Sequence, residues 1–184
     1  MAQRLARLAH SLNIEDIPAL VRDRAKYLIL DAVGIAFVTR HYPISEKTRN
    51  GLLDAVGTGT ASVAGFQEKL PLRDTVIING ALVHGLDYDD THPRSIVHPE
   101  ASSPSTVLGF GEHCDVGGRE LLTAYVTAMQ SIIRIRMAAM GGLHRWGCAA
   151  GVNAAYLAKN GFVGPTCPYE SRFGLYKNHL HDDE

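Results

Sequence analysis

Apolar residues recur every three to four positions along most of the chain, and this spacing is typical of amphipathic helices. Residues Ala61–Phe66 are the one plausible strand, and three prolines predict a loop over residues 92–104. We therefore expect an all-α fold, with a compact helical domain over residues 1–176 and a polar tail over 177–184. Its helices are expected over Ala2–Leu12, Ala19–Val38, Glu46–Val56, Leu72–Asp87, Ser105–His113, Gly118–Met140 and Ala149–Lys159.

The predicted helix over residues 19–38 carries an apolar stripe that is broader than a surface helix needs. Gly34 lies in this stripe and would let another helix approach closely, and Ser45 is expected to cap the next helix. A comparable stripe follows the predicted helix over residues 118–140. Both stripes predict a surface that a second copy of the chain would bury, and so a homodimer. The first stripe consists of Leu20, Val21, Ala25, Leu28, Ile29, Ala32 and Ile35.

Composition argues against two classes of partner. The chain has 18 Lys and Arg against 19 Asp and Glu, so no overall field would draw it to nucleic acid or to an acidic membrane surface. No apolar run approaches the roughly 20 residues that a membrane-spanning helix needs. We expect binding neither to nucleic acid nor to membrane.

The three cysteines are far apart and form no C-x-x-C pair, so neither a zinc knuckle nor a disulfide framework is indicated. Reduced thiols in a cytoplasmic protein are the simplest explanation. The first 14 residues contain Arg4, Arg7 and His10 but no acid, which also resembles a mitochondrial presequence. An ordinary first helix explains the same residues, so we expect a cytoplasmic location, with a mitochondrial one as the alternative in a eukaryote.

The densest polar feature is the sequence His-Gly-Leu-Asp-Tyr-Asp-Asp-Thr-His-Pro over residues 84–93, followed by His98. If the preceding helix continued through residue 91, His84, Asp87 and Thr91 would lie on one of its faces. Solvated aspartates at a helix end would explain the run. A metal site would also use these residue types, although the pattern is neither H-E-x-x-H nor an EF-hand. Nucleophilic catalysis is the weakest interpretation, because no G-x-S-x-G elbow is present.

General acid–base catalysis suits the residue types best, because histidine titrates near neutral pH and a buried aspartate orients it or accepts a proton. The run over residues 79–92, together with His98-Pro99, resembles the signature segment of the MmgE/PrpD family. That family includes 2-methylcitrate dehydratase, cis-aconitate decarboxylase and iminodisuccinate epimerase. The resemblance covers most of the chain, with further similar segments at Leu28–Gly34, Gly118–Val126 and Asn160–Pro165.

Carried over by position, the resemblance places the family's catalytic Asp, Thr and His on Asp87, Thr91 and His98, the last after a spacing one residue longer than in the family. His84 and His92 belong to the same run and are expected to shape the substrate pocket. The resemblance implies a lyase-type enzyme that dehydrates or decarboxylates a small citrate-like or aconitate-like polycarboxylate, without an obligatory metal or other cofactor. An isomerase or epimerase acting on a dicarboxylate is an alternative.

Cationic residues are expected to hold the substrate's carboxylates. Arg134 and Arg136 stand in the helix where the family has an arginine, although solvated charges would explain them equally well. His144 lies in a segment that resembles the family's Lys-x-x-His sequence, but Gly141 stands where the family has the lysine. The family's α/β lid domain also has no counterpart in this sequence. These departures favour the other function class, a catalytically inactive helical dimerisation or ligand-binding module.

Overall fold

The computed structural model describes residues 2–95, 97–138 and 158–161, and within these ranges it is all-α, as expected. A 3₁₀ helix and a two-stranded antiparallel ladder join the α-helices there. The elements in chain order are α1 (Ala2–Ser11), η1 (Ile14–Asp16), α2 (Ala19–Thr39), α3 (Pro43–Val56), β1 (Ala61–Ser62), β2 (Lys69–Leu70), α4 (Leu72–His84), α5 (Pro99–Cys114) and α6 (Gly118–Ala138).

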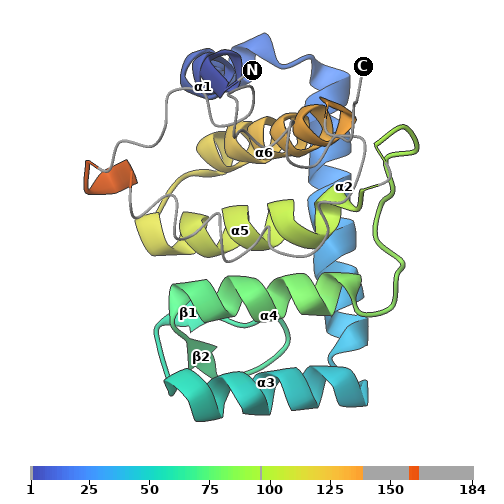
Figure 1. Cartoon of the computed structure of the whole chain (residues 1–184), viewed down its shortest axis with the longest axis vertical. Coiled ribbons are helices and arrows are strands. Elements are labelled where there is room, and N and C mark those ends of the chain that lie inside the picture. The colour runs from blue at the N-terminus through green and yellow to red at the C-terminus, as the bar shows by residue number, and fades with distance from the viewer. Residues whose placement is uncertain (1, 96, 139–157, 162–184) are drawn as a thin grey trace, which may run out of the picture.

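Four helices form a stack in the order α3, α4, α5 and α6, and α1 packs on α6 (Figure 1). The long helix α2 runs across this stack and contacts α4, α5 and α6. Residues 85–98, called the connection below, join α4 to α5 at the side of the stack where α2 lies (Figure 1). No helix in the described part of the chain is long and apolar enough to cross a membrane.

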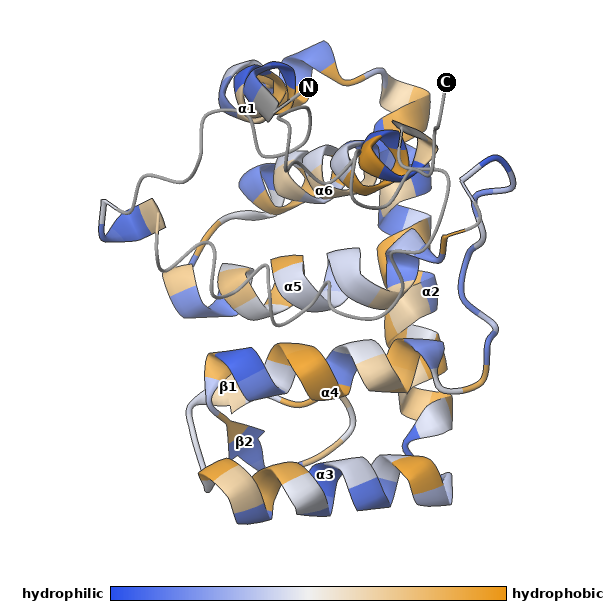
Figure 2. Cartoon of the chain, viewed as in Figure 1, coloured by the Kyte–Doolittle hydropathy of each residue, from blue (hydrophilic) through white to orange (hydrophobic). Residues whose placement is uncertain are grey.

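The core lies on both sides of α5. One apolar cluster joins α2, α4 and the short ladder, and Leu70, Ile78 and Leu82 are its most deeply buried members. A second cluster joins α2, α5 and α6 around Tyr125 and Val107. Both clusters are formed by apolar side chains that neighbouring helices turn towards one another, so burial of apolar area stabilises the stack. Figure 2 shows how hydrophobic and hydrophilic residues alternate along these helices.

The helices on either side of the connection differ from the sequence expectation. α4 ends at His84 instead of continuing to Asp87 or to residue 91, because Asp87 adopts a left-handed backbone conformation with φ of 57°. α5 begins at Pro99, inside the predicted loop over residues 92–104, since a proline at the first helical position has no N–H to leave unpaired. The helix also continues through Pro104.

Two smaller expectations are also corrected, and two lie outside the described residues. The predicted strand at 61–66 is only the two residues of β1, and its partner β2 lies outside the predicted segment. Ser45 lies within the first turn of α3 instead of capping it, and its buried hydroxyl donates a hydrogen bond to the Thr39 carbonyl at 2.6 Å. The predicted helix over 149–159 lies almost entirely outside the described residues, as does the expected polar tail.

The apolar stripe of α2 is only partly buried. Ala25, Ala32 and Ile35 lie in the core, whereas Leu20 is 82% exposed and Val21 is also exposed. No atom lies within 4 Å of a Cβ built at Gly34, so the close helix approach expected there is not made within the described chain. α2 therefore has a second apolar face, called its outer face below, that points to solvent and consists of Leu20, Tyr27, Leu30, Phe37 and Val38.

Candidate active site

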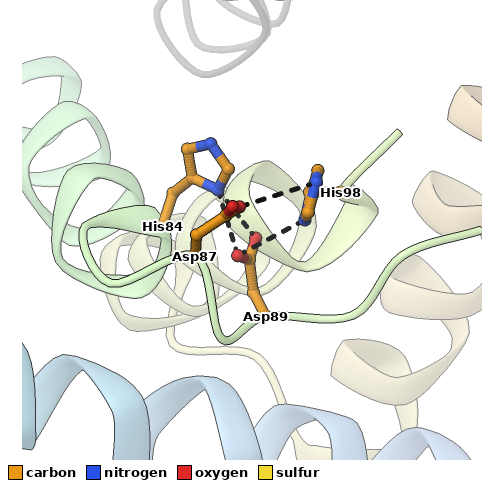
Figure 3. Close-up of side chains that lie close together, drawn as sticks. All are labelled: His84, Asp87, Asp89 and His98. Carbon is orange, nitrogen blue, oxygen red and sulfur yellow. Dashed lines mark hydrogen bonds and ion pairs between the residues drawn. The ribbon is translucent and has the colours of Figure 1, made fainter. Parts of the chain in front are cut away.

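The connection begins with a tight reversal after α4. Gly85 packs against α2 so closely that a Cβ there would lie 2.7 Å from Cγ2 of Thr39, which explains why glycine occupies this position. The Asp87 N–H then donates to the His84 carbonyl at 3.0 Å, and the left-handed conformation of Asp87 turns the chain back. The reversal brings the carboxylates of Asp87 and Asp89 towards the His84 ring (Figure 3).

Two reciprocal hydrogen bonds fasten the connection to the start of α5. The Asp90 N–H donates to Oε2 of Glu100 at 3.0 Å, and the Glu100 N–H donates to Oδ1 of Asp90 at 2.9 Å. An isolated antiparallel bridge between His92 and Val97 closes the tip of the connection. These contacts fix His98, the residue that precedes α5, beside the aspartates.

Four side chains converge at this point: His84, Asp87, Asp89 and His98 (Figure 3). The Asp89 side chain is fully buried, and its carboxylate lies 3.0 Å from Nδ1 of His84 and 3.5 Å from Nδ1 of His98. The other ring nitrogen of His98, Nε2, lies 3.7 Å from Oδ1 of the exposed Asp87. The two imidazole rings meet edge to face at 4.9 Å between centroids.

Thr91 completes the group, since its hydroxyl oxygen lies 3.4 Å from Nδ1 of His98. His98 is thus held at Nδ1 by Asp89 and Thr91, while Nε2 faces the more open side, where Asp87 lies. The His98 side chain is 28% exposed, so a ligand can approach it from solvent. An imidazole held at one nitrogen and accessible at the other is suited to proton transfer.

A buried acidic pair lies directly behind the cluster. Burial raises the pKa of the Glu100 carboxyl to about 7, and the charges of Asp90, Asp31 and Asp89 act in the same direction. Burial also raises the pKa of Asp90, with a further contribution from the charge of Asp89. In the described residues, Oε1 of Glu100 and the Tyr125 hydroxyl are both buried and make no hydrogen bond. The buried position of Glu100 thus favours the neutral form of its carboxyl group.

The structure brings together His84, Asp87, Thr91 and His98, although not on one helical face as expected. His92 lies apart from them, with Nδ1 2.7 Å from the Ser95 hydroxyl. His144 lies outside the described residues.

The two predicted arginines differ from each other. Arg136 reaches the connection, because its Nε–H donates to the Ser95 carbonyl at 3.1 Å. Arg134 is exposed on α6 and donates to the Gln130 side chain on the same helix.

Sequence reasoning did not identify Asp89 and Glu100 as site residues. Asp89 is one of three aspartates in the run, and nothing in the spacing distinguishes it, because its burial depends on the reversal at Asp87. Glu100 could have been noticed as an acid in the first turn of a helix, but only if Pro99 had been recognised as the start of α5.

Comparisons with known proteins identify the family to which the chain is related. Residues 3–148 match the model of the MmgE/PrpD N-terminal domain. The chain is 31% identical to cis-aconitate decarboxylase from Aspergillus terreus, an alignment that covers 86% of this chain and 34% of that protein. It is 29% identical to cis-aconitate decarboxylase-like protein oryM from Aspergillus oryzae, over 71% of this chain and 28% of that protein. Cis-aconitate decarboxylase from Mus musculus is 25% identical over 59% of this chain and 23% of its own length.

The chain spans about a third of the length of the first of these relatives. The match to the family model nevertheless extends over most of the chain and includes the whole connection. This chain belongs to the MmgE/PrpD family.

Proposed function

We propose that this chain takes part in a lyase-type acid–base reaction on a small polycarboxylate, with His98 as the group that transfers the proton. The observation that carries the proposal is the position of His98 between two aspartates, one fully buried and one exposed. The names of the related decarboxylases support an aconitate-like substrate class. Dehydration of a citrate-like substrate and epimerisation of a dicarboxylate use the same kind of group and are outcomes of the test below.

Each residue of the cluster has a distinct role in this proposal. Asp89 and Thr91 hold Nδ1 of His98 and so orient the ring, and the buried carboxylate of Asp89 stabilises the ring when it is protonated. Nε2 of His98 is then the atom that gives or takes a proton. Asp87 lies beside Nε2 on the exposed side, where it accepts a hydrogen bond from a substrate group or from the ring.

The proposed decarboxylation is balanced with these groups. The bond between carbon and the departing carboxylate breaks, carbon dioxide leaves, and the electron pair spreads into the adjacent unsaturated carboxylate system. Protonated His98 delivers a proton to carbon from Nε2, and a proton from solvent restores the ring. In this scheme His98 therefore has to carry the transferred proton on Nε2 when the substrate binds.

The carboxylates of Asp87 and Asp89 would repel a negatively charged polycarboxylate substrate. Binding of such a substrate therefore requires cationic side chains beside the cluster. Arg136 is the best placed of the predicted cations, because it already bonds to the Ser95 carbonyl in the connection. His92 is the next candidate, since it lies in the same tip of the connection. Arg134 and His144 remain predictions for the same role.

Turnover of the 184-residue chain, followed by proton NMR in D₂O with a panel of citrate-like and unsaturated polycarboxylates, tests the proposal. Carbon dioxide loss, water loss and exchange of a carbon-bound proton give different spectra, so the assay also assigns the reaction. Replacing His98 by glutamine is expected to lower the rate about 10²–10⁴-fold, the usual contribution of a general acid or base. The matched control is His113→Gln, an exposed histidine at the other end of α5.

If the wild-type protein binds a panel member without converting it, the enzyme proposal is refuted and the chain is a ligand-binding module. An activity that survives His98→Gln would also refute the role of His98, whichever reaction is observed. A loss of activity in both variants would indicate damage to α5 and not loss of a catalytic group, so thermal unfolding of each variant is measured alongside.

We also propose that the chain forms a homodimer through the outer face of α2. Gly34 lies midway between Leu30 and Val38 and leaves open space above it, so two antiparallel copies of α2 can cross closely there. Light scattering at micromolar concentration tests this, and Leu30→Glu is expected to give a monomer. We also propose a cytoplasmic location, because the three cysteines of the sequence form no C-x-x-C pair and reduced thiols are the simplest explanation for them.

A further inference from the structure

The cluster in Figure 3 holds more metal-binding atoms than proton transfer requires. His84, Asp87, Asp89 and His98 each offer one nitrogen or carboxylate oxygen, and all four atoms lie within 4.8 Å of one another. They come from the last residue of α4, from the reversal, and from the residue before α5. Convergence from three parts of the chain distinguishes the group from a run of solvated acids on one surface segment.

The distances suit a small tetrahedral ion. Zn²⁺ with bonds of about 2.0–2.1 Å to nitrogen and oxygen separates its ligand atoms by roughly 3.3 Å. The carboxylate of Asp89 lies 3.0 Å from Nδ1 of His84 and 3.5 Å from Nδ1 of His98, on either side of that value. The two distances from the Asp89 carboxylate therefore suit ligands of one ion, and all four ligand atoms of the cluster lie within 4.8 Å of one another. Asp87 is exposed and reaches the fourth position by rotation of its side chain.

The ligand types select the class of ion. Two imidazoles with carboxylates suit zinc and neighbouring transition metals, whereas Ca²⁺ and Mg²⁺ prefer sets made entirely of oxygen. The charge also favours a cation, because the ion pairs that Asp87 and Asp89 make within the described residues are all with histidines.

The site is also held in place before any ion arrives. Asp89 is buried, and the reciprocal bonds between Asp90 and Glu100 hold the middle of the connection against the first turn of α5. Ligands that are already oriented need not be ordered by the metal, which favours tight binding. Together these observations carry one conclusion.

We propose that His84, Asp89 and His98, with Asp87 as the fourth ligand, bind a divalent transition-metal ion of the Zn²⁺ class. The proposal stands on the geometry of the cluster and does not depend on the proposed function. It has a consequence for that function, because an ion on Nδ1 of His98 replaces the contacts with Asp89 and Thr91 that orient the ring, and its positive charge opposes protonation of Nε2. Zn²⁺ is thus expected to inhibit turnover, and a chelator to restore it.

Zn²⁺ binding to the full chain, measured by competition with a chromophoric chelator, tests the proposal. Wild-type protein is expected to bind one equivalent with an affinity that His84→Gln and Asp89→Asn each weaken at least tenfold. Because Asp89 is buried and its variant can misfold, Asp87→Asn serves as a second test at an exposed ligand and is expected to weaken binding by a smaller factor. Co²⁺ in place of Zn²⁺ should show the visible absorption of a four-coordinate ion.

His113→Gln and Asp54→Asn, both at exposed positions outside the cluster, are the matched controls and should bind Zn²⁺ as the wild type does. Zinc held by histidines or cysteines elsewhere in the sequence would survive the cluster variants. Wild type that binds no Zn²⁺ at micromolar concentration, or cluster variants that bind like the controls, would overturn the proposal. If the protein binds zinc but shows no turnover in the absence of zinc, the metal-site proposal is supported and only the proposed reaction is refuted.

Discussion

Helix α4 and the connection that follows it are stabilised in opposite ways. In α4, apolar side chains such as Val76, Ile78 and Leu82 are almost completely removed from solvent. The connection buries a carboxylate and a hydroxyl instead, those of Asp89 and Ser95, and each is matched to a histidine. Burial of apolar area contributes a large free energy of folding but supplies no reactive group. Buried polar pairs contribute little net stability, but they fix the positions of groups that can react. Stability and reactivity are therefore assigned to different segments.

The largest expected effect tests the stable side of this comparison. Ile78→Ala removes a fully buried side chain from the cluster between α2 and α4, and the resulting cavity is expected to lower the free energy of unfolding by about 2–5 kcal/mol. The matched change in the connection is Tyr88→Ala, since Tyr88 is 72% exposed. That variant is expected to stay within about 0.5 kcal/mol of the wild type.

Urea unfolding followed by circular dichroism measures both changes. Equal losses in the two variants would show that the connection is as tightly packed as the helices and would remove the contrast. An Ile78→Ala variant that kept its stability would mean that the cluster collapses around the cavity, which the rigid stack of helices does not favour.

The second prediction concerns the buried acid that anchors the connection. Glu100 has an ordinary pKa of 4.5 and a folded pKa of about 7, because burial disfavours its charged form. Below pH 4.5 the carboxyl is neutral in both states and costs nothing. As the pH rises towards 7, the unfolded chain ionises first, so the wild type loses stability across this interval and stays less stable above it.

Glu100→Gln removes this titration and keeps an oxygen that can accept the Asp90 N–H. The variant is expected to be more stable than the wild type by about 1–3 kcal/mol at pH 8 and nearly equal to it at pH 4.5, since one pKa unit corresponds to about 1.4 kcal/mol. Unfolding in urea at both pH values, with a chelator present, measures the difference. A constant difference between the two pH values would show that Glu100 does not titrate between them.

The contrast between the two regions also explains what the sequence predicts well. Helices such as α4 and α6 follow from apolar spacing, because each buries one continuous stripe. The residue types of the site could be predicted because Asp87, Thr91 and His98 lie close together in the sequence, in a segment that resembles a family signature. Their arrangement could not be predicted, because it depends on a single backbone angle at Asp87 and on where α5 begins.

The smallest expected effect isolates that backbone angle. Asp87 is exposed and its φ is 57°, a conformation that costs alanine roughly 1–2 kcal/mol but that glycine and asparagine adopt readily. Asp87→Ala is therefore expected to be about 1 kcal/mol less stable than Asp87→Gly, while Asp87→Asn stays within about 0.5 kcal/mol of the wild type. Thermal unfolding monitored by circular dichroism measures this series.

The same three variants separate the shape of the reversal from its chemistry. All three remove the carboxylate beside Nε2 of His98, so all three are expected to reduce turnover if that carboxylate takes part in the reaction. Only Asp87→Ala strains the backbone that places Asp89 against the two histidines. Activity kept by the glycine and asparagine variants and lost by the alanine variant would therefore assign Asp87 the role of a hinge that positions Asp89, and would leave His98 and Asp89 as the reactive pair.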